Sequence, residues 1–92
     1  MSKALFPLGQ TVATPGALEA LEASGQSPLI FLARHQSGDW GDLDDDDKRE
    51  NELSIREGFR ILSAYHTSNG TKIWVISEAS REYTTILLPS EY

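Results

Sequence analysis

Two histidines and two aspartates are the residues of this sequence best suited to acid–base chemistry. They are His35, Asp39, Asp42 and His66. Imidazole and carboxylate groups exchange protons at moderate pH and also bind transition metals. A cleft holding all four would suit a small metal- or His/Asp-dependent hydrolase or nucleic-acid-processing enzyme. Their spacing matches no metal-binding motif such as His-Glu-x-x-His, so we predict no metal site.

A tryptophan lies between the two aspartates, in the stretch Asp39-Trp40-Gly41-Asp42. A tryptophan in a glycine-flanked loop either anchors the loop in the core or serves as an exposed contact for a partner. The core position is favoured because a chain of 92 residues needs the apolar area. If the loop and the segment after it form a contact surface, its residues are Asp39, Trp40, Asp42, Asp45, Asp46 and Asp47.

Asp44 to Asp47 form an unbroken acidic run. The run does not follow the spaced Asp-x-Asp-x-Asp-Gly pattern of calcium loops. Neighbouring residues on a helix point about 100° apart, so these carboxylates would not converge on a cation. Acids do suit the first turn of a helix, where the macrodipole favours negative charge, and Asp44 is a candidate N-cap. The run therefore predicts the solvated start of a helix.

Charge and composition exclude several classes of protein. The net charge is −6 and the eight basic residues are scattered, whereas binding to a phosphate backbone needs clustered lysine and arginine. We therefore expect no direct nucleic-acid binding. No apolar run reaches the length of a membrane span, and residues 1–7 are too short for a secretory signal. Cysteine is absent, and no glycine-rich phosphate loop is present. These features indicate a soluble cytoplasmic protein without a cofactor.

Helix signals fill residues 14–57, after an extended arm or edge strand over residues 1–13. Thr14-Pro15 and Ser27-Pro28 each combine a capping hydroxyl with a proline suited to the first helical position. Gly25 and Gly58 are expected to end the first and the third helix. The third helix, residues 44–57, has few apolar side chains and should lie on the outside.

From residue 58 to residue 89 the pattern is that of strands. Ile61, Ser63 and Tyr65 alternate with more polar positions, Asn69-Gly70 favours a hairpin turn, and residues 73–76 are apolar throughout. We predict one α+β domain over residues 1–92, with two or three short N-terminal helices packed on a C-terminal three-stranded antiparallel meander. The N-terminal arm is a candidate fourth strand at one edge.

Six segments together carry a resemblance to a known family. They are residues 8–18, 34–35, 62–65, 72–76, 84–89 and the stretch Ser37-Gly38-Asp39-Trp40-Gly41-Asp42. In these segments the chain resembles short uncharacterised proteins encoded on bacterial plasmids and other mobile elements. Some members are labelled as a subunit of a type I restriction methyltransferase. This chain is too short for a cofactor-binding methyltransferase domain and has no Asn-Pro-Pro-Tyr-type motif. The resemblance thus implies a bacterial, mobile-element setting and no catalytic residues.

These observations lead to a first hypothesis and two alternatives. The first is a non-enzymatic protein-interaction domain, in one version an acidic decoy that occupies the basic groove of a DNA-handling protein. The second is the His/Asp-dependent enzyme described above. The third is an accessory domain that assembles through an exposed strand edge, which includes a homo-oligomer.

Overall fold

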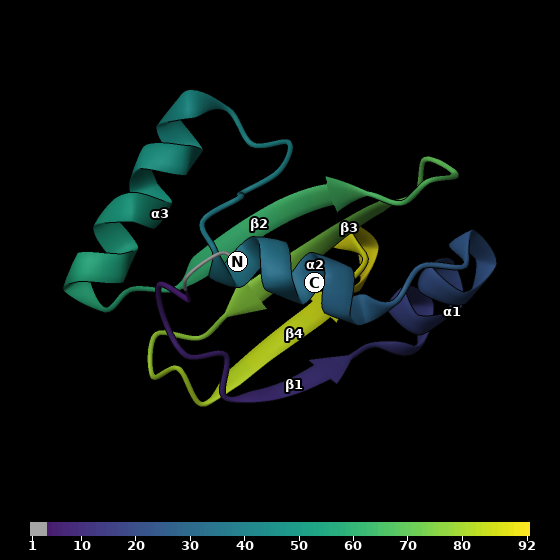
Figure 1. Cartoon of the computed structure of the whole chain (residues 1–92), viewed down its shortest axis with the longest axis horizontal. Coiled ribbons are helices and arrows are strands. Elements are labelled where there is room, and N and C mark those ends of the chain that lie inside the picture. Colours follow the sequence, from purple (N-terminus) through teal and green to yellow (C-terminus); the bar gives the residue numbers. More distant parts are fainter. Residues whose placement is uncertain (1–3) are drawn as a thin grey trace.

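Residues 4–92 fold into a four-stranded sheet with three α-helices and a short 3₁₀ helix (Figure 1), as the computed structural model describes them. In chain order the elements are β1 (Gln10–Ala13), α1 (Pro15–Ser24), α2 (Pro28–Gln36), α3 (Asp45–Glu57), β2 (Ile61–His66), β3 (Lys72–Ser77), β4 (Tyr83–Leu87) and η1 (Pro89–Glu91). Residues 1–3 of the predicted arm lie outside the described part. Within residues 4–92, no helix combines the length and the apolar character that crossing a bilayer requires.

The helices begin and end at the predicted capping residues. The side chains of Thr14, Ser27 and Asp44 each accept a backbone N–H from the first turn of the helix that follows. Gly25 and Gly58 end α1 and α3 in the left-handed conformation, in which glycine has no Cβ to clash. The predicted start and stop signals of these helices are therefore confirmed.

The sheet is mixed, with the strand order β1-β4-β3-β2. β2, β3 and β4 pair antiparallel, whereas β1 lies parallel to β4. The α+β class is confirmed, and so is the N-terminal arm as a fourth strand at one edge. The sheet as a whole is not a three-stranded antiparallel meander, because this edge strand adds a parallel pairing to the three antiparallel strands. Gly9 makes this approach possible, since a Cβ there would lie 2.4 Å from the carbonyl oxygens of Arg81 and Glu82.

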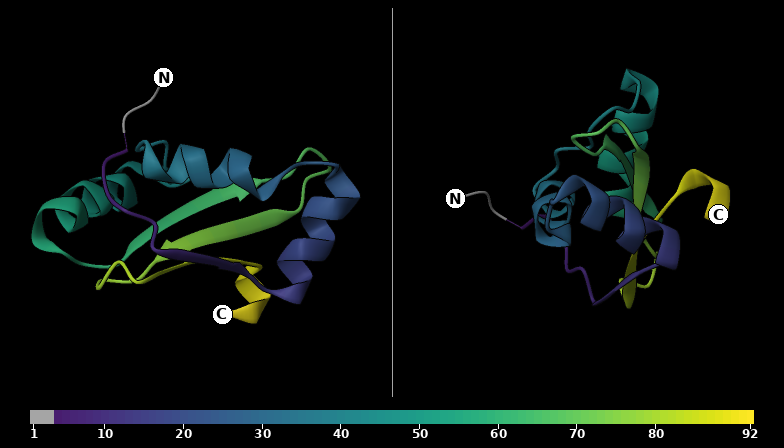
Figure 2. Two further views of the ribbon diagram at one scale, coloured as in Figure 1. Left: turned by 60° about the horizontal axis from the view of Figure 1, so that its bottom comes forward. Right: turned by 90° about the vertical axis from the view of Figure 1, so that its right-hand side faces the viewer.

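The main core lies between one face of the sheet and the helices α1 and α2. Figure 2 shows α2 along this face, η1 on the opposite side, and α3 beside the β2 edge. The core residues are Ala17, Leu21, Phe31, Leu32, Tyr65, Ile73, Val75 and Ile86. Ile61, Ser63 and Tyr65 of β2 are buried, as the alternating pattern predicts. The opposite face of the sheet is only partly covered, and the candidate site lies there.

The outer edge of β2 is covered by a side chain of α3. The amide nitrogen of Asn51 donates to the Leu62 carbonyl at 2.7 Å, and the Leu62 N–H donates to the Asn51 amide oxygen at 3.2 Å. The primary amide thus takes the place of one residue of a neighbouring strand. This pair joins α3 to the sheet and removes one outward hydrogen-bonding site from the edge.

The loop before α3 covers the next outward site on β2. The Ala64 N–H donates to the Trp40 carbonyl at 3.2 Å, and the Asp42 N–H donates to the Ala64 carbonyl at 2.7 Å. Gly41 lies between them with a φ of +74°, and a Cβ there would be 2.0 Å from the Ala64 oxygen. Another chain therefore cannot extend the sheet at Leu62 or Ala64. The strand at the other edge of the sheet is β1, whose residues 10–12 are exposed.

Candidate functional site

The structure does not bring the four predicted catalytic residues together. His35 is buried on the α2 face of the sheet, where it contacts Ser63 of β2. His66 lies three residues after Ser63 and therefore points to the opposite face, where it is exposed and pairs with Asp42 at 2.8 Å. Among residues 4–92, no three His, Asp or Glu side chains are grouped closely enough to hold a metal ion. A single cleft containing all four residues is absent from this arrangement.

His35 is part of a buried polar chain that reaches from α2 to the N-terminal arm. Its Nδ1 lies 2.6 Å from the Ser63 hydroxyl, and its Nε2 lies 2.9 Å from the Ser77 hydroxyl. Ser77 contacts the Thr84 hydroxyl at 2.7 Å, and Thr84 donates to the Leu8 carbonyl at 2.7 Å. The chain links α2, three strands and the segment before β1.

The direction of these hydrogen bonds determines the tautomer of His35. Thr84 uses its one proton on a carbonyl, so Ser77 must donate to Thr84 and accept from Nε2–H. Nδ1 of the neutral ring then accepts from Ser63. Burial, with a smaller contribution from the Arg81 guanidinium, lowers the pKa of His35 to about 4. The ring is thus held neutral, with its proton on Nε2.

Aromatic side chains separate His35 from solvent. The Phe6 ring meets the imidazole edge-on at 5.2 Å between centroids, and the Trp40 ring does so at 6.0 Å. His35 and Ser63 are both 0% exposed. A nucleophilic Ser–His pair must be reached by its substrate, so we assign this pair to the stability of the core.

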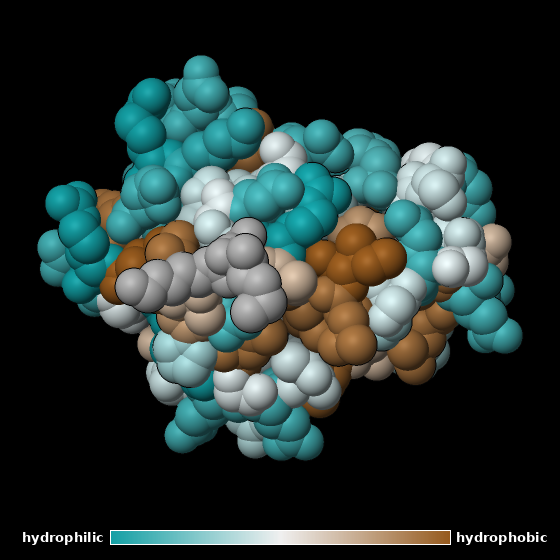
Figure 3. Space-filling view, in the orientation of Figure 1, coloured by the Kyte–Doolittle hydropathy of each residue, from teal (hydrophilic) through white to brown (hydrophobic). Residues whose placement is uncertain are grey.

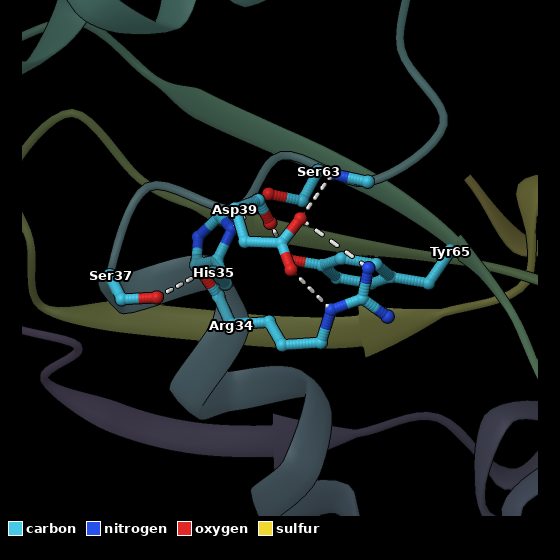
Figure 4. Close-up of polar contacts among 7 residues, drawn as sticks. Arg34, His35, Ser37, Asp39, Ser63 and Tyr65 are labelled. Atoms are coloured by element: carbon cyan, nitrogen blue, oxygen red, sulfur yellow. Dashed lines mark hydrogen bonds and ion pairs between the residues drawn. The ribbon is translucent and has the colours of Figure 1, made fainter. Parts of the chain in front are cut away.

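Asp39 holds the loop in place (Figure 4). Its carboxylate accepts from Arg34 Nε at 2.7 Å and from the Gly41 N–H at 3.2 Å, and its carbonyl accepts from the Tyr65 hydroxyl at 2.6 Å. The hydrogen bond from Arg34 lowers the pKa of Asp39, and burial raises the pKa of Tyr65 to about 12. Asp39 is therefore already engaged within the chain.

Trp40 is a core residue and not an exposed contact. Its side chain is 4% exposed and packs in a second cluster with Phe6 and Ile61. A partner cannot reach this indole while the loop is folded. The prediction that Trp40 anchors the loop in the core is confirmed. The alternative prediction, in which Trp40 belongs to an exposed contact surface, is wrong.

The candidate functional site is a groove between α3 and the partly covered face of the sheet, with a volume of about 790 Å³. Its floor is formed by Leu62, Ala64 and Trp74, which alternate with the core-facing residues of β2 and β3. The other lining residues are Asp42, Leu43, Asp44, Asp47, Glu50, Asn51, Ser54, Phe59, Arg60 and Lys72. We call this feature the α3 groove.

The charges of the α3 groove are unevenly distributed. Four carboxylates come from α3 and the loop before it, and two cations, Arg60 and Lys72, come from the sheet side. Asp42 pairs with His66, whereas Asp44, Asp47 and Glu50 have no ion pair within residues 4–92. The α3 wall of the groove therefore carries three carboxylates without an ion pair, of which Asp44 accepts the Asp47 N–H as the cap of α3.

The remaining predicted contact residues lie at the start of α3 but outside the α3 groove. Asp45 and Asp46 are exposed in the first turn, and Asp46 pairs with Arg49. In Figure 3 hydrophilic residues cover α3, whereas an apolar patch lies over α2. Of the predicted acidic set, the structure thus places Asp42 and Asp47 in the groove and Asp45 and Asp46 on the adjoining surface.

No family model, curated protein or solved structure matches this chain. The α3 groove is therefore judged on its own geometry and chemistry.

Sequence reasoning missed several residues of these sites. Asn51 is an amide in the middle of a strongly charged helix, and its weak helix propensity was a usable signal that it serves a tertiary contact. Ser63 occupies an inward position between Ile61 and Tyr65, which could have indicated a buried polar partner. Trp74 lies in the apolar run of residues 73–76, and no local signal distinguishes a residue packed in the core from one at the floor of a groove.

Proposed function

We propose that this protein is a non-enzymatic interaction domain whose acidic surface, formed by α3 and the loop before it, binds a positively charged surface of a protein partner. The observation that carries the proposal is the α3 wall, where Asp44, Asp47 and Glu50 have no ion pair within residues 4–92. Asp45 extends the negative surface around the helix start. Such a surface attracts a basic partner over several ångströms and speeds association.

The separation of His35 from His66 favours this proposal over a hydrolase. General acid–base chemistry needs groups within hydrogen-bonding reach of one substrate. His35 lies in the core and His66 on the opposite face of the sheet, paired with Asp42. We therefore place the function on the acidic surface and assign the histidines no catalytic role.

In its specific version the partner is a DNA-handling protein, and this chain is an acidic decoy for its basic groove. A row of carboxylates presents the sign of charge that a phosphate backbone presents, without a nucleic acid. The resemblance to bacterial mobile-element proteins supports a cytoplasmic setting in which restriction or defence proteins are candidate targets. A homo-oligomer through the β1 edge is compatible with this function and is not needed for it.

The test is capture of partners from a bacterial lysate at low salt, followed by elution with a short DNA duplex. We expect the duplex to release the captured proteins, because decoy and DNA compete for one basic surface. The triple variant Asp45→Asn, Asp46→Asn and Asp47→Asn should capture about fivefold less, with most of the loss from Asp47, the one of the three that lines the α3 groove.

A matched variant controls for the loss of charge alone. Glu19→Gln, Glu22→Gln and Glu82→Gln remove the same number of charges from exposed positions outside both the α3 groove and the first turn of α3. This variant should capture the same proteins as the unmodified chain. Capture that is unchanged in the aspartate variant, or that resists excess duplex, would contradict the decoy.

A further inference from the structure

We propose that the α3 groove binds a short basic peptide segment of the partner, with one apolar side chain of that segment seated over Trp74. The inference rests on the proposed function, because it names the part of the acidic surface that the partner occupies. Three properties of the groove support it: its floor, its charged wall, and the closed edge of β2.

The floor offers apolar surface to a ligand. Leu62 and Trp74 are partly exposed on the face of the sheet away from the main core, and Phe59 at the rim is 54% exposed. The Trp74 ring packs edge-on against Tyr92 at 5.7 Å between centroids, so it is held from one side. Aromatic side chains in partly desolvated pockets are typical anchor points of protein interfaces. An aliphatic or aromatic side chain placed here would remove apolar surface from water.

The wall selects the charge of the ligand. Asp47, Glu50, Asn51 and Ser54 are spaced by three and four residues, so they form one stripe of α3 that faces the groove. Asn51 and Ser54 are buried at its base, and the two exposed carboxylates stand above them. Beside an apolar floor the field of these carboxylates is less screened than on an open surface. Lysine or arginine is therefore favoured there, and a phosphate backbone is repelled.

The size of the groove and the closed edge limit how the segment binds. A volume of about 790 Å³ is that of a small-ligand pocket, roughly 300–1,000 Å³, and holds a few side chains. Because Asn51 and the loop already use the outward hydrogen-bonding groups of Leu62 and Ala64, the segment cannot add to the sheet as a strand. Side-chain contacts must hold it, with its cations on the α3 side, away from Lys72.

The experiment titrates the full chain with a short lysine-rich peptide that carries a central leucine pair. Two matched peptides replace the leucines by serine or the lysines by glutamate. Affinity is measured by calorimetry, and the binding site is followed through the NMR signals of the indole N–H groups. The sequence has only two tryptophans. The Trp74 signal should shift on titration, whereas the signal of buried Trp40 should not.

Two variants with equal loss of charge locate the site on α3. The groove variant, Asp47→Asn with Glu50→Gln, should weaken binding of the leucine peptide by about tenfold. The outer variant, Asp45→Asn with Asp46→Asn, should change it by less than about twofold, because those carboxylates lie outside the groove. The serine and glutamate peptides should bind the unmodified chain more weakly than the leucine peptide.

The outcomes separate this inference from the proposed function. If both variants weaken binding equally and the serine peptide binds as well as the leucine peptide, the acidic surface acts diffusely, and the groove proposal is overturned while the proposed function stands. An unmoved Trp74 signal, or tighter binding of the glutamate peptide, also overturns the groove proposal. The proposed function fails independently, if the lysate experiment shows no loss of capture.

Discussion

His35 is a titratable group whose neighbours hold it in one protonation state. Both ring nitrogens of His35 are hydrogen-bonded, Nδ1 to the Ser63 hydroxyl and Nε2 to the Ser77 hydroxyl. If Nδ1 were protonated, it would have to donate to the Ser63 oxygen, and the Ser63 hydroxyl proton would no longer have Nδ1 as its acceptor. Folding therefore favours the neutral ring. The residue that looks most catalytic in the sequence thereby becomes a source of pH-dependent stability.

We expect acid to destabilise the protein through His35. Its pKa falls from 6.5 to about 4 on folding, so the unfolded chain binds the proton more readily between those values. The contribution of His35 is complete above pH 6.5, and roughly 3 kcal/mol of it is lost as the pH falls towards 4. The free energy of unfolding, measured with urea at several pH values between 4 and 6.5, should therefore rise with pH.

Two variants test whether His35 is the source of this slope of the free energy of unfolding against pH. His35→Gln retains one acceptor and one donor but cannot titrate, so the slope between pH 6.5 and 4 should flatten, whatever the cost in packing. Leu29→Gln, at an exposed position of the same helix that carries no titratable group, should leave the slope as it is. An unchanged slope in His35→Gln would show that the buried histidine is not its source.

At the scale of elements, α3 is the helix least supported by apolar contact. Its first turn is stabilised by the Asp44 cap and by acids near the positive end of the helix dipole, whereas its attachment to the sheet depends on Asn51. Arg81 adds a second attachment, because its guanidinium donates to the Ser54 carbonyl at 3.0 Å and to the Phe59 carbonyl at 2.8 Å. The position of α3, and with it the width of the α3 groove, thus depends on these two polar side chains together with Ile55, which packs against the cluster of Phe6, Trp40 and Ile61.

Asn51→Ala should loosen α3 from the sheet. The change removes both hydrogen bonds to Leu62, so the backbone N–H and carbonyl of Leu62 lose their partner on α3. The free energy of unfolding should fall by roughly 1–3 kcal/mol. Alanine favours a helix more than asparagine does, so the loss cannot come from helix propensity. Hydrogen exchange of the Leu62 amide should accelerate, and chemical denaturation gives the change in stability.

Glu52→Ala is the matched control on the same helix. This side chain is exposed, and its replacement should change stability by less than about 0.5 kcal/mol without affecting exchange at Leu62. Asn51→Ala should also raise the tendency to self-associate, because it opens the β2 edge. If the Leu62 amide exchanges at the same rate in both variants, the amide pair does not hold α3.

At the scale of the whole molecule, Glu91 joins the two ends of the described chain. Its carboxylate accepts from the Thr14 hydroxyl at 2.5 Å, from the Gly16 N–H at 3.0 Å and from the Leu88 N–H at 2.9 Å. A residue of η1 thereby caps the N-terminus of α1. The hydrogen bond from Thr14, more than the other contacts, lowers the pKa of Glu91.

Glu91→Gln should lower the melting temperature at neutral pH, because the amide carries no charge and one of its two positions is a donor. Since the pKa of Glu91 is lower in the folded chain, its contribution is present above the ordinary value of 4.5 and is lost as the pH falls below it. The difference in melting temperature between wild type and variant should therefore become smaller at acidic pH. Glu22→Gln, at an exposed position of α1, serves as control, and a difference that persists in acid would contradict the role of the charge.

Local patterns in the sequence determined the ends of the helices and the faces of the strands. Thr14, Ser27 and Asp44 cap helices because a short polar side chain reaches the free N–H groups two or three residues later. The buried positions of β2 follow from alternation along one strand. These features depend on residues that are close in the chain, and a single sequence contains that information.

Only the tertiary structure decided which polar and aromatic side chains are buried, which of them meet and where the groove forms. The burial of Trp40 and His35, the separation of His35 from His66, the pairing of β1 with β4 and the α3 groove all depend on contacts between segments far apart in the chain. The types and spacing of these residues are compatible with several arrangements. Which arrangement forms depends on how the helices cover the sheet, since that packing decides which side chains meet and which remain exposed.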